Sequence, residues 1–210
     1  MSSTIALESK KKLNPKAVVV EKLKMLVFIV ILGTLSATLL VTLESYTMKM
    51  VLANVGAELQ SGVLDVFALE YTAETSDRVF ADNITVEPVG EVILYRAANG
   101  SIASRFNGEG LWGPIAGIVA LSSDMKTIDG VIILEQQETP GLGGRIVETE
   151  FLSQFKGVEV EPQLVIKKGG EAAGKGNEVD GITGATMTSK ALENMLNNHI
   201  TNVRQLLGVK

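Results

Sequence analysis

The longest uninterrupted apolar run of the chain lies near its N-terminus. Residues 25–43 read MLVFIVILGTLSATLLVTL and contain no charged side chain. As a helix, these 19 residues would span roughly 28 Å, enough for the hydrocarbon core of a bilayer. A cleaved signal peptide is the rival interpretation, but it has a shorter apolar core, and no convincing A-x-A site is present. We therefore expect an uncleaved transmembrane helix at 25–43.

The hydrophobic pattern after this helix predicts an α+β fold. Apolar residues recur every three or four positions between 44 and 70, which is typical of a helix, and we assign 44–75 as a stalk or packing helix. Short apolar or alternating runs between turn residues predict strands. The other expected elements are an extended segment at 79–90, strands at 92–95, 99–102, 115–121, 127–135 and 158–168, a short helix at 148–155, a flexible polar loop at 169–177 and an amphipathic helix at 188–207. We expect one domain at 76–210, an antiparallel sheet with flanking helices.

Charge is distributed unevenly along the chain. Residues 1–24 hold six lysines and two glutamates, which leaves 13 of the 19 basic and 22 of the 24 acidic residues for the rest. The positive-inside rule makes 1–24 a basic cytoplasmic tail and places everything after residue 43 outside the cytoplasm. An acidic domain would be repelled by phosphates, so we expect no nucleic-acid partner.

Composition restricts the chemistry that the chain can perform. It has no cysteine and one histidine, His199, which excludes disulfides, zinc–thiolate sites, iron–sulfur ligation and a bis-histidine haem. We expect no metal ligands and no catalytic residue, so a redox cofactor would be organic or belong to a partner. His199 falls on or near the apolar face of the last helix, where we expect a partly buried structural histidine.

The first glycine-rich motif, Gly108-Glu-Gly-Leu-Trp-Gly113, matches G-x-G-x-x-G. A dinucleotide fingerprint requires a strand before the glycines and a helix after them, whereas a proline and a β-branched run follow here. We interpret the motif as a loop entering a strand, with Trp112 as a partly buried anchor or, as the alternative, a ligand contact. The chain has no P-loop sequence.

Two further motifs permit a structural and a functional interpretation each. Glu138-Thr-Pro-Gly-Leu-Gly-Gly144 is either a tight turn or a backbone surface that lies flat against a planar ligand. Asp180-Gly-Ile-Thr-Gly-Ala-Thr186 precedes the C-terminal helix, whose N-terminus suits a phosphate. Alternatively, Thr188 or Ser189 is simply the N-cap of that helix.

The stretch D-G-I-T-G-A-T-M-T-S resembles the flavinylation motif of FMN-binding domains in Rnf and sodium-pumping NADH:quinone oxidoreductase complexes. E-T-P-G-L-G-G and G-E-G-L-W-G-P-I resemble that family's flavin-contacting loop and glycine-rich strand entry, in the same order. In this family a flavin transferase joins the FMN phosphate to a threonine hydroxyl as a phosphoester. The resemblance implies that FMN is covalently bound to the threonine after Gly-Ala, which is Thr186.

The resemblance also implies roles for the neighbouring residues. Gly184 and Ala185 would allow close approach, and Asp180 would order the turn or assist the transferase. The isoalloxazine would be flanked by Thr139, Leu142 and Gly143. The remaining expected cofactor-binding residues are Gly181, Thr183, Thr188 and Trp112.

The family further implies an electron-carrying subunit of an ion-translocating complex, without substrate turnover of its own. Its partners would be the other membrane subunits, the flavin transferase and the lipid bilayer. It would be a single-pass protein of a bacterial or archaeal cytoplasmic membrane, with the FMN domain outside. The short chain favours RnfG, the FMN-binding subunit of Rnf, over NqrC, its counterpart in the NADH:quinone pump. A stand-alone membrane-tethered flavoprotein and a flavin-free adhesion or scaffold domain remain as alternatives.

Overall fold

The structure is a computed structural model, and it describes residues 15–209. Residues 1–14 of the expected basic tail therefore lie outside the described residues. The chain divides into two compact units, Met1–Asn54 and Val55–Lys210, and each is described by itself.

The first unit consists of the N-terminal part of helix α1 (Pro15–Val66). Within it, Val19–Glu44 is apolar and long enough to cross a membrane, and none of its most apolar window is buried by protein. Its polar side chains bond to their own helix: the Thr42 hydroxyl donates to the Thr38 carbonyl at 2.7 Å, and Thr34 donates to Val30. Hydroxyls satisfied in this way are compatible with a lipid environment.

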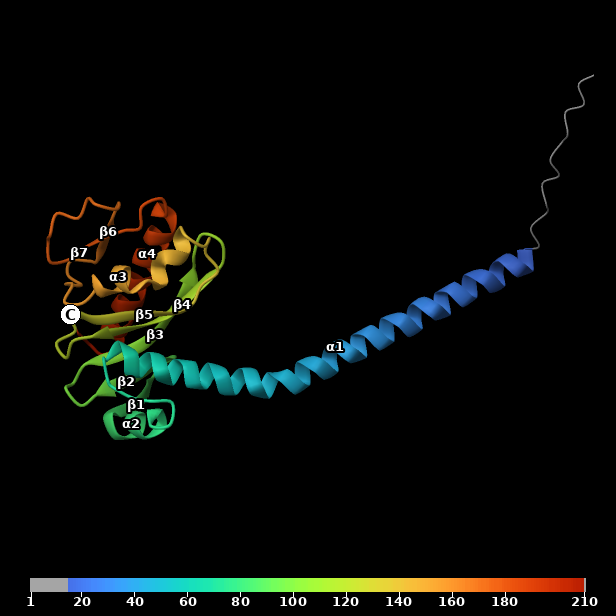
Figure 1. Cartoon of the computed structure of the whole chain (residues 1–210), viewed down its shortest axis with the longest axis horizontal. Helices are drawn as coiled ribbons and strands as arrows, with labels where there is room; N and C mark the ends of the chain where they lie inside the picture. The colour runs from blue at the N-terminus through green and yellow to red at the C-terminus, as the bar shows by residue number, and fades with distance from the viewer. Residues whose placement is uncertain (1–14, 210) are drawn as a thin grey trace, which may run out of the picture. The chain divides into compact units, whose positions relative to one another are not determined.

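The second unit is built on a five-stranded antiparallel sheet (Figure 1). The strands follow the order β1-β2-β3-β4-β5, so each pairs with its neighbour in the sequence. Their bounds are β1 Ile84–Val89, β2 Val92–Ala97, β3 Ile102–Glu109, β4 Pro114–Leu121 and β5 Ile128–Glu135. Gly90 and Gly100 have φ of 61° and 88°, a conformation that tight turns between antiparallel strands require and that glycine adopts without strain.

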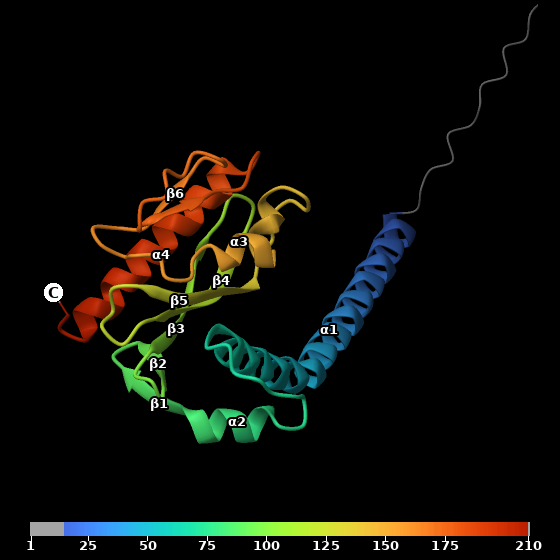
Figure 2. The ribbon, with the colours of Figure 1, turned by 60° about the vertical axis from the view of Figure 1, so that its left-hand side comes forward.

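Both faces of this sheet are covered (Figure 2). One face packs against the end of α1, where Val63 and Leu64 are fully buried. The other packs against α4 (Thr186–Leu206), through residues such as Leu192 and Leu196. Burial on both faces explains why β4 reads as a continuous apolar run rather than an alternating one. The expected α+β fold, with one N-terminal apolar helix and an antiparallel sheet, is confirmed.

The smaller elements flank this core. They are α2 (Ser76–Asn83), a 3-10 helix η1 (Gly143–Val147), α3 (Thr149–Ser153) and a parallel pair of short strands, β6 (Val165–Lys167) and β7 (Glu178–Asp180). The predictions for 115–121, 127–135 and 148–155 are therefore confirmed to within a few residues.

Several expected boundaries were wrong. The segment expected to be extended at 79–90 begins as helix α2, because Val79 and Phe80 turn inward onto the core beneath β1 and β2. The expected helix at 44–70 ends at Val66, and the strand expected at 99–102 starts at its last residue. The C-terminal helix begins two residues earlier than expected, at Thr186.

The strand expected at 158–168 is also wrong, since only Val165–Lys167 forms one. Before it, the backbone is satisfied in other ways. The Asn197 side chain accepts a hydrogen bond from the Leu164 N–H at 3.0 Å and donates to its carbonyl at 2.8 Å, while Glu159 forms an isolated bridge with Thr127. A side chain of α4 thus replaces a neighbouring strand as the hydrogen-bonding partner.

Candidate functional site

Three motifs that are far apart in the sequence meet at one buried carboxylate, Glu138, whose residue is 5 % exposed. Its Oε1 accepts hydrogen bonds from the backbone N–H groups of Leu111 (2.7 Å) and Trp112 (3.0 Å), in the loop between β3 and β4. Its Oε2 accepts one from the Thr188 hydroxyl, in the first turn of α4, at 2.6 Å. Glu138 therefore joins both glycine-rich motifs to the threonine-rich one.

Two glycines make room for this carboxylate. A Cβ on Gly110 would lie 2.4 Å from Glu138 Oε1, and one on Gly143 would lie 2.5 Å from Thr188 Oγ1. Real Cβ atoms do not approach so closely. Gly143, expected to flank a flavin, is buried against these two side chains. At both positions glycine is required because a side chain would collide with the Glu138 network.

The glycine loops themselves have the expected backbone. Gly110 N–H donates to the Gly113 carbonyl at 2.8 Å between the end of β3 and the start of β4, which confirms a loop that enters a strand. The Thr139 carbonyl accepts from the N–H groups of Leu142 (3.1 Å) and Gly144 (2.9 Å), so this loop is a tight turn. The Thr139 side chain is exposed.

The four hydroxyls around the start of α4 have different environments. Thr188 and Ser189 are buried, Thr188 bonded to Glu138 and Ser189 Oγ accepting the Ile182 N–H at 3.2 Å. Thr183 and Thr186 are exposed. Within residues 15–209, the Thr186 hydroxyl has no hydrogen-bond partner, whereas a Cβ on Gly169 would lie 2.5 Å from Thr183 Oγ1. Thr186 is therefore the least encumbered of the four.

The start of α4 is not capped as the alternative interpretation required. Ala185 occupies the N-cap position and no side chain caps the helix, so neither Thr188 nor Ser189 is the N-cap. The first bond of the helix runs from the Ser189 N–H to the Ala185 carbonyl at 3.0 Å. The N–H groups of Thr186, Met187 and Thr188 precede that bond, and such groups favour an anion.

Gly184 lies directly before this helix start with φ of 84°. A Cβ there would also lie 3.2 Å from Leu142 Cδ2. The turn therefore needs glycine for its conformation and brings the side chain of Leu142 against the motif. Ala185, next in sequence, is buried.

Exposed apolar side chains surround this position. Trp112 is 71 % exposed, Met187 63 %, Leu111 50 % and Leu142 46 %. The interpretation of Trp112 as a partly buried packing anchor is therefore wrong: its backbone is held by Glu138, while its ring faces solvent. The three segments that Glu138 joins each present a large apolar side chain at the surface.

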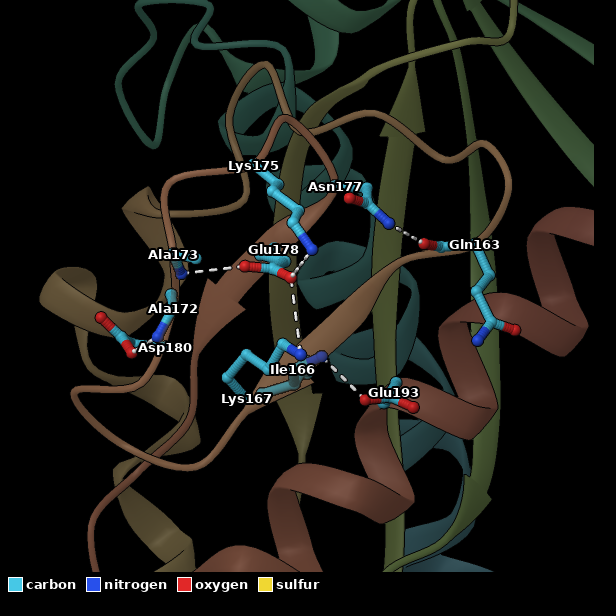
Figure 3. A network of polar contacts seen from close by, with 10 residues as sticks. All are labelled: Gln163, Ile166, Lys167, Ala172, Ala173, Lys175, Asn177, Glu178, Asp180 and Glu193. Atoms are coloured by element: carbon cyan, nitrogen blue, oxygen red, sulfur yellow. Dashed lines mark hydrogen bonds and ion pairs between the residues drawn. The ribbon is translucent and has the colours of Figure 1, made fainter.

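Asp180 orders the loop before the motif rather than the turn within it (Figure 3). Its Oδ1 accepts the Ala172 N–H at 2.9 Å, and its own N–H donates to Gln154 Oε1 at 3.1 Å. Nearby, Glu178 accepts the Ala173 N–H at 2.9 Å and lies 3.5 Å from the ammonium groups of both Lys167 and Lys175. The Ala173 N–H, followed by the two lysines, lowers the pKa of the Glu178 carboxyl.

The same loop supports the motif from below. A Cβ on Gly181 would lie 2.5 Å from the Lys167 carbonyl, and the Gly181 N–H donates to that carbonyl at 2.8 Å. Although it has no regular secondary structure, the expected polar loop at 169–177 is thus fixed at both Ala172 and Ala173.

His199 lies apart from this cluster. Its Nε2 is 2.7 Å from Ser104 Oγ, and burial lowers the pKa of its imidazole to about 4. The ring is therefore neutral at physiological pH and half-buried, as expected for a structural histidine. Among the described residues, no three His, Asp or Glu side chains form a group that could hold a metal ion.

Residues 110–201 match the model of the FMN-binding domain family. The curated relatives include NqrC, the third-lettered component of the Na(+)-translocating NADH-quinone reductase, from Vibrio vulnificus strain YJ016; it is 34% identical over 110 residues, which are 48% of this chain and 43% of the relative. The same protein of Haemophilus ducreyi is 41% identical over 92 residues, 41% of this chain and 35% of the relative. The chain thus spans less than half the length of the curated relatives that it matches.

Solved structures give the same fold. NqrC of Shewanella oneidensis superposes with a TM-score of 0.64 at 22% identity, covering 72% of this chain and 97% of that one. NqrC of Parabacteroides distasonis gives 0.60 at 24% identity, covering 70% and 90%. All three converging motifs are consistent with this family. The chain belongs to the FMN-binding-domain family that contains NqrC and RnfG.

Proposed function

We propose that this chain is a membrane-anchored, electron-carrying subunit of a Na+-translocating NADH-quinone reductase-type complex, with FMN joined to Thr186 through a phosphoester. One observation carries the attachment site. Of the four hydroxyls around the start of α4, Thr186 is exposed and without a hydrogen-bond partner in the described chain, while Thr188 and Ser189 are buried and bonded.

The residues present fit FMN. The phosphate would lie at the N-terminus of α4, where the first N–H groups are not capped by any side chain. The apolar isoalloxazine would lie against exposed side chains such as Leu142 and Trp112. When bound, FMN supplies the exchange of one or two electrons, and the protein around it adjusts the potential.

The attachment itself involves no change in oxidation state. A bond forms between Thr186 Oγ1 and the phosphorus of FMN, and an activated phosphoryl donor is needed because a free phosphate monoester is a poor electrophile. A flavin dinucleotide is such a donor: its bond to AMP breaks, AMP leaves, and the hydroxyl proton passes to a base of the transferase. This chain contributes the nucleophile and its position.

The relatives favour NqrC over RnfG. The matching proteins from Vibrio vulnificus and Haemophilus ducreyi are both NqrC, so the expectation of RnfG is not confirmed. Both assignments imply the same cofactor and other membrane subunits as partners. We further propose that Val19–Glu44 crosses a bacterial or archaeal cytoplasmic membrane with its N-terminus inside, as the lysine-rich tail predicts.

Copurification tests the membership of a complex. Tagged chain extracted from its native membrane in mild detergent should bring down other membrane subunits together with NADH-oxidising activity. A solitary protein that still carries flavin would favour the stand-alone flavoprotein instead. A protein without flavin, from cells shown to contain active transferase, would favour a scaffold role and refute the proposal.

A further inference from the structure

We infer that Glu138 is a positioning residue for flavin attachment: it holds the start of α4 against the β3–β4 loop so that the Thr186 hydroxyl is presented to the transferase. This inference deepens the proposed function and rests on it. Sequence reasoning did not single out Glu138, since its partners lie 26, 27 and 50 residues away.

The carboxylate is fully engaged. Two backbone donors share its Oε1, and the Thr188 hydroxyl occupies its Oε2. Its own backbone is fixed as well, since its N–H donates to Gln136 Oε1 at 2.7 Å. A buried carboxylate accepting three donors binds them more strongly than a neutral acceptor would. Two neighbouring glycines, Gly110 and Gly143, leave no room for this side chain to move.

The connection to Thr186 runs through the first turn of α4. Thr186 is the first residue of the helix and Thr188 the third, so both lie in the turn that has no side-chain cap. An uncapped helix end tends to fray. Here tertiary bonds replace the cap: Thr188 to Glu138, and the Ile182 N–H to Ser189 Oγ. Fixing Thr188 therefore fixes the direction in which the Thr186 hydroxyl points.

Two substitutions separate geometry from mere presence. Glu138→Ala leaves two buried N–H groups and one hydroxyl without their acceptor. Glu138→Gln retains an oxygen for Leu111 and Trp112, and its amide can donate to Thr188 Oγ1 once that hydroxyl rotates. Gln should therefore preserve the position of Thr186, whereas Ala should not. Glu135→Gln is the matched control, since it neutralises an exposed carboxylate three residues away that pairs with Arg105.

The first measurement is the rate of flavin attachment to purified full-length chain by a flavin transferase supplied with a flavin dinucleotide. A mispositioned nucleophile lowers kcat more than it raises KM. We expect kcat to fall about tenfold or more for Glu138→Ala, to recover largely in Glu138→Gln and to be unchanged in Glu135→Gln. Thr188→Val, which removes a single bond, should fall between Ala and wild type and serves if the alanine variant does not fold.

The second measurement needs no flavin. Trp112 is the only tryptophan of the chain, and its N–H is one of the three donors. Its fluorescence anisotropy should drop in Glu138→Ala and remain near the wild-type value in Glu138→Gln. Unchanged kcat and anisotropy in Glu138→Ala, beside efficiently flavinylated wild type, would overturn the role of Glu138 alone. Wild type that receives no flavin from an active transferase would overturn the proposed function and this inference together.

Discussion

Replacing Gly143 by alanine should destabilise the domain much more than the same change at Gly141. At Gly141 φ is 75° and a Cβ would meet nothing within 4 Å, so the cost is the left-handed backbone alone, about 1–2 kcal/mol. At Gly143 a Cβ would lie 2.5 Å from Thr188 Oγ1 and 2.7 Å from Glu138 Oε2. Overpacking costs about 1–3 kcal/mol, and loss of a hydrogen bond to a charged group adds about 1.5–3 kcal/mol.

The sum for Gly143→Ala is therefore about 3–5 kcal/mol. For a domain of this size, each kcal/mol lowers the melting temperature by about 2–4 °C. Scanning calorimetry of the full chain in mild detergent should show a drop of about 6–20 °C for Gly143→Ala and about 2–8 °C for Gly141→Ala. Equal drops in the two variants, or a harmless Gly143→Ala, would refute the argument that Gly143 is required for space.

Three further outcomes follow from the structure. Asp180→Ala should free the loop before the motif, seen as faster hydrogen exchange at the Ala172 amide with other amides unaffected. The folded pKa of His199 is lowered from 6.5 to about 4, so its contribution, about 3 kcal/mol, should be lost as pH falls from 6.5 to 4; His199→Gln should flatten that part of the stability curve, and parallel curves would contradict the assignment. Thr34→Val and Thr42→Val should leave ion coupling intact in an assembled complex, since both hydroxyls bond to their own helix; lost transport would contradict this.

The elements that could be predicted from sequence are those whose signal is local. The uncharged run at 25–43 predicts its helix because lipid accepts no other kind of segment. The apolar run of β4 and the amphipathic spacing of α4 are equally direct, because burial on two faces or one leaves a plain pattern. The helix α2 could not be predicted, since Ser76–Asn83 has few apolar residues and is placed by the core that Val79 and Phe80 join.

The candidate site divides in the same way. Its attachment threonine follows from a contiguous motif, but the environment of that threonine depends on partners far away in the sequence. Nothing near Trp112 indicates that its N–H is bonded to Glu138 while its ring is exposed. Nor does the motif reveal that Thr188 is bonded to the same carboxylate. A buried acid next to glycines was the available signal, and it was too weak without the fold.

The measurement that tests the account most directly is in-gel flavin fluorescence after full denaturation, on chain coexpressed with an active flavin transferase. Wild type should fluoresce, Thr186→Val should be dark, and Thr183→Val, which alters the other exposed hydroxyl, should remain fluorescent. A fluorescent Thr186→Val would move the attachment to another hydroxyl. A dark wild type would contradict covalent flavin altogether.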